Sequence, residues 1–386
     1  MKVLAITNLF ANSRQPERGI FNTQQFVELA KICELQVVAP LPWFPKMKTT
    51  DKRAIFSEIP EEETMEGIKT YHPRYFLIPK IGRSLYGFLF YFGIINKVKE
   101  IYKKFPFDVI VGTWAYPDAF AAALVAKKMD KPLVVKVHGS DVNVMTNYFL
   151  RRKMIKFAFN RAFKITPVSY PLKDKIVSLG IPAAKVETIE NGMNVTMFKK
   201  MDKKECRQTL GLGSDKKHVV YVGNLVPIKG IQFLVEAFKY LPKDVTLSVV
   251  GDGELRPELE ANVKRWQLED RVYFFGRLPH DKIPYWLNAA DIFCLPTLNE
   301  GCPNVILEAI ACGTPIVATR IGPIPEMVSS PQSGEVVNPG DPKALADGIQ
   351  RVLNRSVGIN PAPYKILSWQ ENARKFFTIL EKAAKA

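Results

Sequence analysis

Apolar residues occur along this chain in short continuous runs separated by longer amphipathic stretches. The runs Lys2–Thr7 and Leu35–Pro40 flank Phe21–Ile32, in which the apolar residues have helical spacing. The alternation continues through the apolar runs Val109–Thr113 and Leu133–His138. Short apolar strands separated by helices predict an open, doubly wound α/β sheet.

A second alternation of the same kind starts at His218–Val222. Further strands are predicted at Thr246–Val250, Val272–Phe275 and Ile292–Leu295. Because 386 residues are too many for one ordinary core, the chain is expected to form two domains. We predict a first domain at residues 1–195 and a second at 196–364, with the linker near residues 195–215.

Two further segments have a distinctive composition. Residues 41–80 are rich in carboxylates and prolines, which predicts an irregular surface excursion. Arg151–Lys164 predicts a basic amphipathic helix. The expected basic side of that helix comprises Arg152, Lys153, Lys156 and Lys164, and the expected apolar contacts are Met154, Phe157, Ala158 and Phe163.

The densest group of candidate functional residues lies in Leu298–Thr319, which reads LNEGCPNVILEAIACGTPIVAT. Glu300 falls in a turn, and Glu308 falls eight residues later in a predicted helix, Val305–Cys312, that Gly313 ends. The amino end of that helix suits an anion such as a diphosphate. Glu308 needs a partner in so apolar a helix, and two vicinal ribose hydroxyls would supply one. From spacing alone, a surface loop followed by an exposed glutamate is an open alternative.

This stretch resembles the nucleotide-sugar signature of the retaining GT-B glycosyltransferases of family 4, the glycosyl transferases group 1, of the bacterial and archaeal polysaccharide-biosynthesis type. The matching residues are Glu300, Gly301, Pro303, Leu307, Glu308, Ala309, Ala311, Cys312, Gly313, Pro315, Ile316, Val317, Ala318 and Thr319. The resemblance implies an α/β GT-B fold, with two Rossmann-like domains facing across a crevice. It also implies that the C-terminal helix, residues 365–386, packs back on the N-terminal, acceptor-side domain, while residues 196–364 bind the nucleotide sugar.

The activity that the resemblance implies is transfer of a sugar from a UDP- or GDP-sugar to a hydroxyl of a glycan or lipid-linked acceptor. The anomeric configuration would be retained, as in retaining hexosyltransferases of the EC 2.4 type. No cofactor and no metal are expected, and no convincing D-x-D motif is present. Two alternatives are a GT-B sugar-nucleotide epimerase and a non-catalytic nucleotide-sugar-binding protein.

In the family, a strand-to-helix turn of the second domain commonly reads G-R-L with a lysine five residues on, and the two cations hold the donor diphosphate. The turn Gly223–Gly230 retains Lys229 but has Asn224 in place of the arginine. A neutral amide thus replaces a bidentate cation, the one feature that favours the non-catalytic alternative. The donor contacts expected in the second domain are Asn224, Lys229, Arg277, Glu300, Gly301, Cys302, Pro303, Asn304 and Glu308.

The first domain offers a second group of candidates. His138-Gly139-Ser140-Asp141 follows a predicted strand, at the end where open α/β sheets bind ligands. The family places its H-G-x-D motif over the donor sugar, so His138 joins Lys229 and Glu300 as a candidate catalytic residue, with Asp141 supporting it. Gly19 precedes the first helix and is a candidate donor contact, although a plain turn is an open alternative.

Composition and charge narrow the possible partners. The five cysteines are scattered, which indicates a reducing, cytoplasmic setting, and neither a signal peptide nor a membrane-spanning run is expected. Residues 1–200 hold 31 Lys and Arg against 17 Asp and Glu, whereas residues 201–386 hold 23 against 21. No nucleic-acid-binding signature accompanies this charge, so nucleic acid is not expected as a partner. An anionic membrane surface or a phosphorylated acceptor would explain the positive charge. On a membrane, Arg151–Lys164 and the aromatic Tyr86–Phe92 would contact the inner face; a merely solvated basic face is the alternative.

Overall fold

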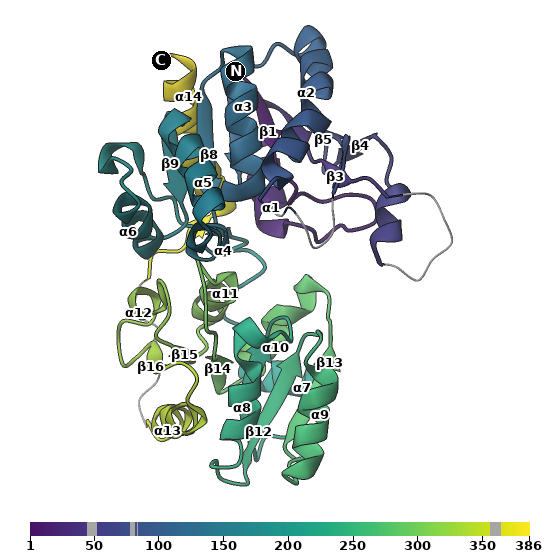
Figure 1. Ribbon diagram of the computed structural model, residues 1–386. Helices are drawn as coiled ribbons and strands as arrows, with labels where there is room; N and C mark the ends of the chain where they lie inside the picture. The colour runs from purple at the N-terminus through teal and green to yellow at the C-terminus, as the bar shows by residue number, and fades with distance from the viewer. Residues whose placement is uncertain (45–51, 78–81, 83, 356–363) are drawn as a thin grey trace. The chain divides into compact units, whose positions relative to one another are not determined.

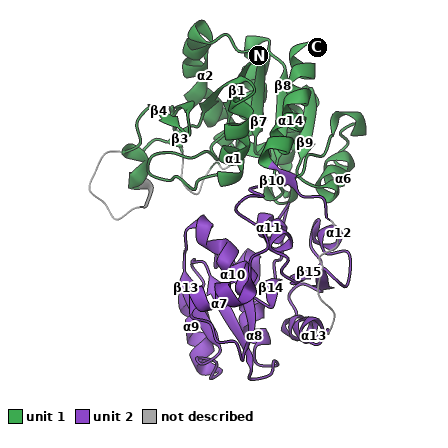
Figure 2. Cartoon of the chain, turned by 180° about the vertical axis from the view of Figure 1, so that it is seen from behind, with its two compact units in different colours: residues 1–192, 369–386 green, residues 193–368 purple. Residues whose placement is uncertain are grey.

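The computed structural model of the chain describes residues 1–44, 52–77, 82, 84–355 and 364–386 (Figure 1). These residues form two compact units (Figure 2). Unit 1 comprises residues 1–192 and 369–386, and unit 2 comprises residues 193–368. The chain crosses between the units at two short strands, β10 (Gly192–Met193) and β17 (Leu367–Ser368).

The sheet of unit 1 has the strand order β4-β5-β2-β1-β7-β8-β9, in which β4 is antiparallel to β5 and the other pairings are parallel. Its strands are β1 (Lys2–Ile6), β2 (Glu34–Val38), β4 (Glu62–Met65), β5 (Ile68–Tyr71), β7 (Val109–Thr113), β8 (Leu133–Val137) and β9 (Lys164–Pro167). The central strands β7 and β8 are buried throughout, which is why they are largely apolar in the sequence, with Lys136 of β8 as the charged exception.

Helices cover both faces of this sheet (Figure 1). On one face α1 (Ile20–Ala30) and α14 (Trp369–Ala384) pack against each other and share a core with Val111 of β7. On the other face α3 (Phe120–Met129) lies against Gly112, where a Cβ would come within 2.9 Å of the Ala122 methyl. α3 packs between α2 (Tyr86–Lys104) and α5 (Phe149–Arg161). The shorter helical segments are η1 (Lys52–Ser57), η2 (Ala115–Ala119), α4 (Ser140–Asn143), η3 (Met145–Asn147), α6 (Tyr170–Ser178) and η4 (Ala183–Lys185).

Residues 41–80 contain more regular structure than the sequence predicted. β3 (Leu41–Pro42) pairs with β6 (Arg74–Tyr75), and β4 and β5 form a hairpin at the edge of the large sheet. The hairpin turns at Glu66 and Gly67, which both have positive φ, as a two-residue type I′ turn requires. The predicted irregular excursion was therefore wrong for these residues, because the Glu-Gly turn signal was missed. Residues 45–51 and 78–80 of that segment lie outside the described residues.

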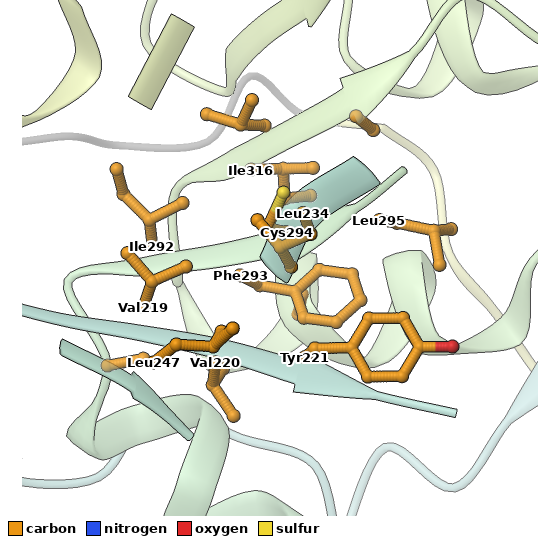
Figure 3. Packing of buried hydrophobic residues seen from close by; sticks show 14 of the residues in the cluster. Val219, Val220, Tyr221, Leu234, Leu247, Ile292, Phe293, Cys294, Leu295 and Ile316 are labelled. Carbon is orange, nitrogen blue, oxygen red and sulfur yellow. The ribbon is translucent and has the colours of Figure 1, made fainter. Parts of the chain in front are cut away.

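The sheet of unit 2 has the strand order β13-β12-β11-β14-β15-β16, with every pairing parallel. Figure 3 shows Val219, Phe293 and Ile316 from neighbouring strands packed together with Leu234. The strands are β11 (Lys217–Val222), β12 (Val245–Val250), β13 (Val272–Gly276), β14 (Ile292–Leu295), β15 (Ile316–Thr319) and β16 (Gly334–Val337). Two sheets, one wholly parallel and one parallel except for the edge strand β4, are each covered by helices and confirm the predicted α/β class with two Rossmann-like units.

The helices of unit 2 include one that the sequence analysis assigned to a linker. α7 (Lys203–Leu210) lies within residues 195–215, and the Asp202 carboxylate caps it by accepting the N–H of Glu205 at 2.9 Å. α7 packs against α10, and its Cys206 is buried. The Asp-x-x-Glu capping signal was missed. The other helices are α8 (Ile231–Ala237), α9 (Arg256–Arg265), α10 (Ile283–Ala289), α11 (Asn304–Cys312), α12 (Ile324–Met327) and α13 (Pro342–Leu353), with η5 (Pro227–Lys229) and η6 (His280–Lys282).

The predicted basic helix Arg151–Lys164 also needs a correction. α5 ends at Arg161, and Lys164 already opens β9, so Phe163 and Lys164 are not on the helix. Ala162, directly after the last residue of α5, already has extended backbone, which leads the chain into β9. Within the described ranges, no helix combines the length and the apolar character needed to cross a bilayer.

A buried polar chain ties α14 to α1 and β8. Asn372 of α14 accepts a hydrogen bond from the Gln25 amide at 2.6 Å and donates one to the carbonyl of Glu190 at 2.6 Å. Lys136 of β8 is 2% exposed and donates to Gln25 Oε1 at 2.7 Å. Buried amides and a buried ammonium are costly without partners, so this chain of bonds selects the position at which α14 docks.

We expect Gln25→Leu to lower the free energy of unfolding by about 3 kcal/mol, because it takes an acceptor from a buried ammonium and a donor from Asn372. Urea denaturation followed by circular dichroism measures the change. Gln24→Leu, the same substitution at the neighbouring half-buried position, should cost no more than about 0.5 kcal/mol. Equal losses in the two variants would contradict this account of α14 docking.

Candidate active site

The turns that follow β11 and β14 carry Lys229 and Glu300. These strands are neighbours in the sheet, so the turns at their carboxyl ends meet at one edge. Lys229 Nζ lies 2.5 Å from Glu300 Oε1, and the side chain of Glu300 is only 10% exposed. Two of the residues predicted to contact the donor are thus held as an ion pair.

Backbone contacts hold these two turns together. Gly230 has a φ of +67°, and a Cβ there would lie 2.0 Å from the carbonyl oxygen of Pro296. The carbonyl of Ile228 accepts the N–H of Leu298 at 2.9 Å and the hydroxyl of Thr297 at 3.2 Å. Only glycine fits at position 230. The close approach of the two turns, which positions Lys229, therefore depends on the glycine that directly follows this lysine.

Asn224 lies exposed in the turn directly after β11. Its carbonyl oxygen accepts a hydrogen bond from the Tyr221 hydroxyl at 2.9 Å. The preceding Gly223 packs so closely on Gly251 that a Cβ on Gly251 would lie 1.9 Å from its oxygen. The path of this turn is therefore determined by backbone contacts, and a larger side chain at position 224 leaves them intact.

Glu308 has a partner within the protein. It lies on α11, which begins at Asn304, one residue before the predicted helix, and ends at Cys312 as predicted, with Gly313 (φ +73°) as its C-cap. Glu308 is 8% exposed, and its Oε1 lies 2.9 Å from His280 Nε2. His280 opens η6 and packs its ring on Phe198, with the centroids 5.1 Å apart. His280 was not among the residues predicted from the sequence; its place shortly after the strand that ends at Gly276 was the available signal.

The other candidates in unit 2 lie beside these residues in the chain. Arg277 directly follows β13 and is exposed. Gly301 is buried, and Cys302 is partly buried. Pro303 has extended backbone and immediately precedes α11. Together they form the loop and helix start at the carboxyl edge of the sheet, the place where parallel α/β sheets bind ligands.

In unit 1, His138 follows β8 at the equivalent edge of its own sheet. Its ring lies between aromatic neighbours, with centroids 4.3 Å from that of Phe21 and 6.1 Å from that of Trp114. Nε2 is buried and has no hydrogen-bond partner among the described residues. Burial, reinforced by the Lys136 ammonium, lowers the pKa of His138 well below its ordinary value. The imidazole is therefore neutral at pH 7 and retains an unused hydrogen-bonding atom.

Asp141 organises the loops around that histidine. Its Oδ1 accepts the backbone N–H groups of His138 at 3.0 Å and Gly139 at 2.7 Å. Its Oδ2 accepts the N–H of Ala115 at 2.8 Å, in the loop after β7. Burial raises the pKa of Asp141 in spite of these bonds. One buried carboxylate thus joins the loops that follow two neighbouring strands.

Gly19 has a structural requirement of its own. Its φ is +61°, and a Cβ there would lie 2.2 Å from the carbonyl oxygen of Leu9. Close by, Asp118 is a buried carboxylate that the sequence analysis did not single out. Its Oδ1 accepts the N–H of Asn8 at 2.5 Å, and burial raises its pKa well above the ordinary range.

Among the residues that the structure describes, no three His, Cys, Asp or Glu side chains are grouped so as to hold a metal ion.

Family models match both units of the chain. Residues 55–196 match the model of glycosyltransferase family 4, and residues 216–355 match that of the glycosyl transferases group 1. The glycosyltransferase TuaC of Bacillus subtilis (strain 168), provisionally assigned to teichuronic acid biosynthesis, is 31% identical over 366 residues. This match covers 92% of the chain and 90% of the relative. The chain therefore belongs to the family 4, group 1 glycosyltransferases.

Solved structures show the same fold. Sucrose-phosphate synthase from Thermosynechococcus elongatus has a TM-score of 0.78 at 20% identity, covering 99% of this chain and 98% of that one. Anabaena Alr3699/HepE in complex with UDP has a TM-score of 0.73 at 21% identity, covering 100% of this chain and 99% of that one. The predicted GT-B fold and the prediction of a glycosyltransferase are confirmed.

We expect Asp141→Asn to lower the free energy of unfolding by about 2–3 kcal/mol. In the asparagine, an NH2 group replaces one of the two carboxylate oxygens. At least one buried backbone N–H that bonded to that oxygen is then left without an acceptor. Thermal and urea unfolding measure this loss. Ser140→Ala alters the exposed neighbour and should be close to neutral; a fully stable Asp141→Asn variant would show that the three hydrogen bonds do not hold the loops.

Proposed function

We propose that the protein is a retaining hexosyltransferase that moves a sugar from a UDP- or GDP-sugar to an acceptor hydroxyl. The observation that carries this proposal is the Lys229–Glu300 pair at the carboxyl ends of β11 and β14. The pair combines a cation suited to a diphosphate with a carboxylate suited to sugar hydroxyls. The matches to family 4 and group 1 glycosyltransferases support the reaction class.

Lys229 would hold the diphosphate without releasing Glu300. An ammonium has three donors, so its bond to the carboxylate leaves others for phosphate oxygens. The amino end of α11, which begins at Asn304, would add a second anion-binding element through the positive end of its helix dipole. Gly301, Cys302 and Pro303 would border the same phosphates, and the backbone at Arg277 would contact the base.

Glu308 would bind the ribose. Its Oε1 is engaged by His280, so Oε2 is the oxygen proposed to accept a ribose hydroxyl. Glu300 would accept hydroxyls of the transferred sugar. His138, which burial keeps neutral, would hydrogen-bond the sugar through Nε2. Gly19 would contribute only by keeping its loop close to the backbone of Leu9.

The proposed reaction needs no protein nucleophile, metal or cofactor. The acceptor oxygen attacks the anomeric carbon on the face from which the diphosphate departs, which preserves the configuration. The bond from that carbon to the diphosphate breaks as the bond to the acceptor forms, and the acceptor proton passes to a diphosphate oxygen. Lys229 and the amino end of α11 would stabilise the negative charge on the leaving diphosphate.

For the acceptor we propose a glycan or lipid-linked glycan, reached at the cytoplasmic face of an anionic membrane. The relative assigned to teichuronic acid biosynthesis supports a polysaccharide product. The excess of cations in residues 1–200 supports the membrane, together with exposed apolar side chains such as Phe92 of α2 and Phe149 of α5.

A thermal-shift screen of UDP- and GDP-sugars, followed by incubation of the stabilising donor with glycan and lipid-linked acceptors, tests the proposal. Transfer should require an acceptor, and NMR of the product should show the anomeric configuration of the donor. Formation of an epimer without acceptor would identify an epimerase instead. Stabilisation by a donor with no turnover on any acceptor would favour a binding protein.

Glu308→Gln should weaken binding of the stabilising nucleotide at least about tenfold. A hydrogen bond to a charged group contributes roughly 1.5–3 kcal/mol, and the amide gives up that charge. Isothermal titration calorimetry measures the dissociation constant. Glu236→Gln, which alters a surface pair between Glu236 of α8 and Lys239, should bind as the unaltered protein does. Unchanged affinity in Glu308→Gln would remove Glu308 from the proposed ribose site.

Asn224→Arg should strengthen UDP or GDP binding by roughly tenfold, because it restores a bidentate cation next to the proposed diphosphate. Asn224→Gln, longer but neutral, is the matched control and should have little effect. Lys229→Ala should reduce affinity less when Asn224→Arg is also present, since a second cation then shares the diphosphate. If the arginine leaves affinity unaltered, this turn does not face the phosphates.

A further inference from the structure

A groove on unit 1 lies between α2 and α3, apart from the site described above. The groove is open to solvent and offers about 520 Å³, a volume comparable with that of small-ligand sites. Phe92 and Phe88 are 67% and 42% exposed, far more than large aromatic side chains usually are. The lining residues are Phe88, Tyr91 and Phe92 of α2 with Leu124, Lys127 and Lys128 of α3.

The apolar surface continues from this groove onto α5. The ring of Phe88 packs edge-on against Phe120 of α3, with the centroids 5.0 Å apart. Phe120 in turn packs against Phe157 of α5, with the centroids 5.8 Å apart. Phe149 and Leu150 at the start of α5 are also exposed, at 60% and 56%. Three helices therefore present apolar side chains that the described part of the protein leaves uncovered.

The same helices are strongly cationic. Neither α3 nor α5 contains a single Asp or Glu. Lys127 and Lys128 line the groove and are exposed. The exposed or partly exposed cations of α5 are Arg152, Lys153, Lys156 and Arg161. An occupant of the groove must therefore be apolar over part of its length and negatively charged at one end.

We propose that the groove binds one hydrocarbon chain of an anionic membrane lipid, with Lys127 and Lys128 holding its phosphate. The inference rests on the membrane location in the proposed function, and it adds a site and a ligand class. A second copy of this chain is a poor occupant, since its own α3 and α5 would bring like charges together. Each methylene that leaves water strengthens lipid attachment, and cations near an anionic leaflet add to it.

Calorimetry of the full chain with decyl phosphate, below the concentration at which it forms micelles, tests the groove directly. We expect one saturable site, with dodecyl phosphate binding roughly tenfold more tightly because it buries two more methylenes. Inorganic phosphate should not bind measurably, because the charge alone lacks the apolar contact. Binding independent of chain length, or no saturable binding, would overturn the proposal.

Variants locate the site within the surface. Leu124→Trp fills the groove and should weaken decyl phosphate binding at least tenfold, whereas Leu150→Trp, an equal change on exposed α5, should not. Phe92→Ser, at a largely exposed position that is not required for folding, should also weaken it. Sedimentation with phosphatidylglycerol vesicles, but not with phosphatidylcholine vesicles, should decrease in the same two variants. Unchanged decyl phosphate binding in both would overturn the assignment.

Two further readouts separate this proposal from others. Binding of the stabilising UDP- or GDP-sugar should persist in every variant, since none of the changed residues is a proposed donor contact and the groove lining does not include His138. Decyl phosphate binding without any nucleotide-sugar binding would refute the proposed function and leave the groove assigned. Light scattering that finds a dimer which Leu124→Trp dissociates would assign the groove to a second copy and overturn the lipid proposal.

Discussion

The candidate site in unit 2 depends on how closely two turns approach at one edge of a parallel sheet. Gly230 lies against the carbonyl of Pro296, and any side chain there would prevent the contact. That contact places Lys229 against Glu300. Both side chains are held before any ligand arrives, so much of the entropy of ordering them is lost on folding and not on binding.

In unit 1 a buried carboxylate holds the loops of the candidate site together, whereas in unit 2 a glycine lets the two turns approach closely. Asp141 gathers three backbone N–H groups from the loops after β7 and β8, and the ring of His138 is packed beside aromatic neighbours. Burial keeps that imidazole neutral, which suits hydrogen bonding to an uncharged sugar better than pairing with a phosphate. Each unit therefore has a rigid, chemically distinct edge at the carboxyl ends of its own strands.

The helices on the two faces of the unit 1 sheet have different roles: one set completes the core, and the other forms the proposed lipid-binding surface. α14 is docked by the buried chain of Lys136, Gln25 and Asn372, and its apolar face completes the core beside α1. On the opposite face of the sheet, α2 and α5 carry aromatic side chains that remain exposed, and α3 between them carries exposed lysines. Cations attract such a surface to an anionic lipid interface, and exposed aromatic rings can insert there. The proposed lipid site would thus bring the protein to the membrane that holds the proposed lipid-linked acceptor.

The sequence by itself determined the α/β class, most strand positions and the identity of Lys229, Glu300 and Glu308 as candidates, because buried parallel strands are continuous apolar runs and the motif is local. It missed the β4–β5 hairpin and α7, whose turn and capping signals are short. Tertiary structure alone decided which groups meet: Lys229 with Glu300, and Glu308 with His280. Those pairs join residues far apart in the chain, and their distances depend on strand order and backbone packing, which no local pattern specifies.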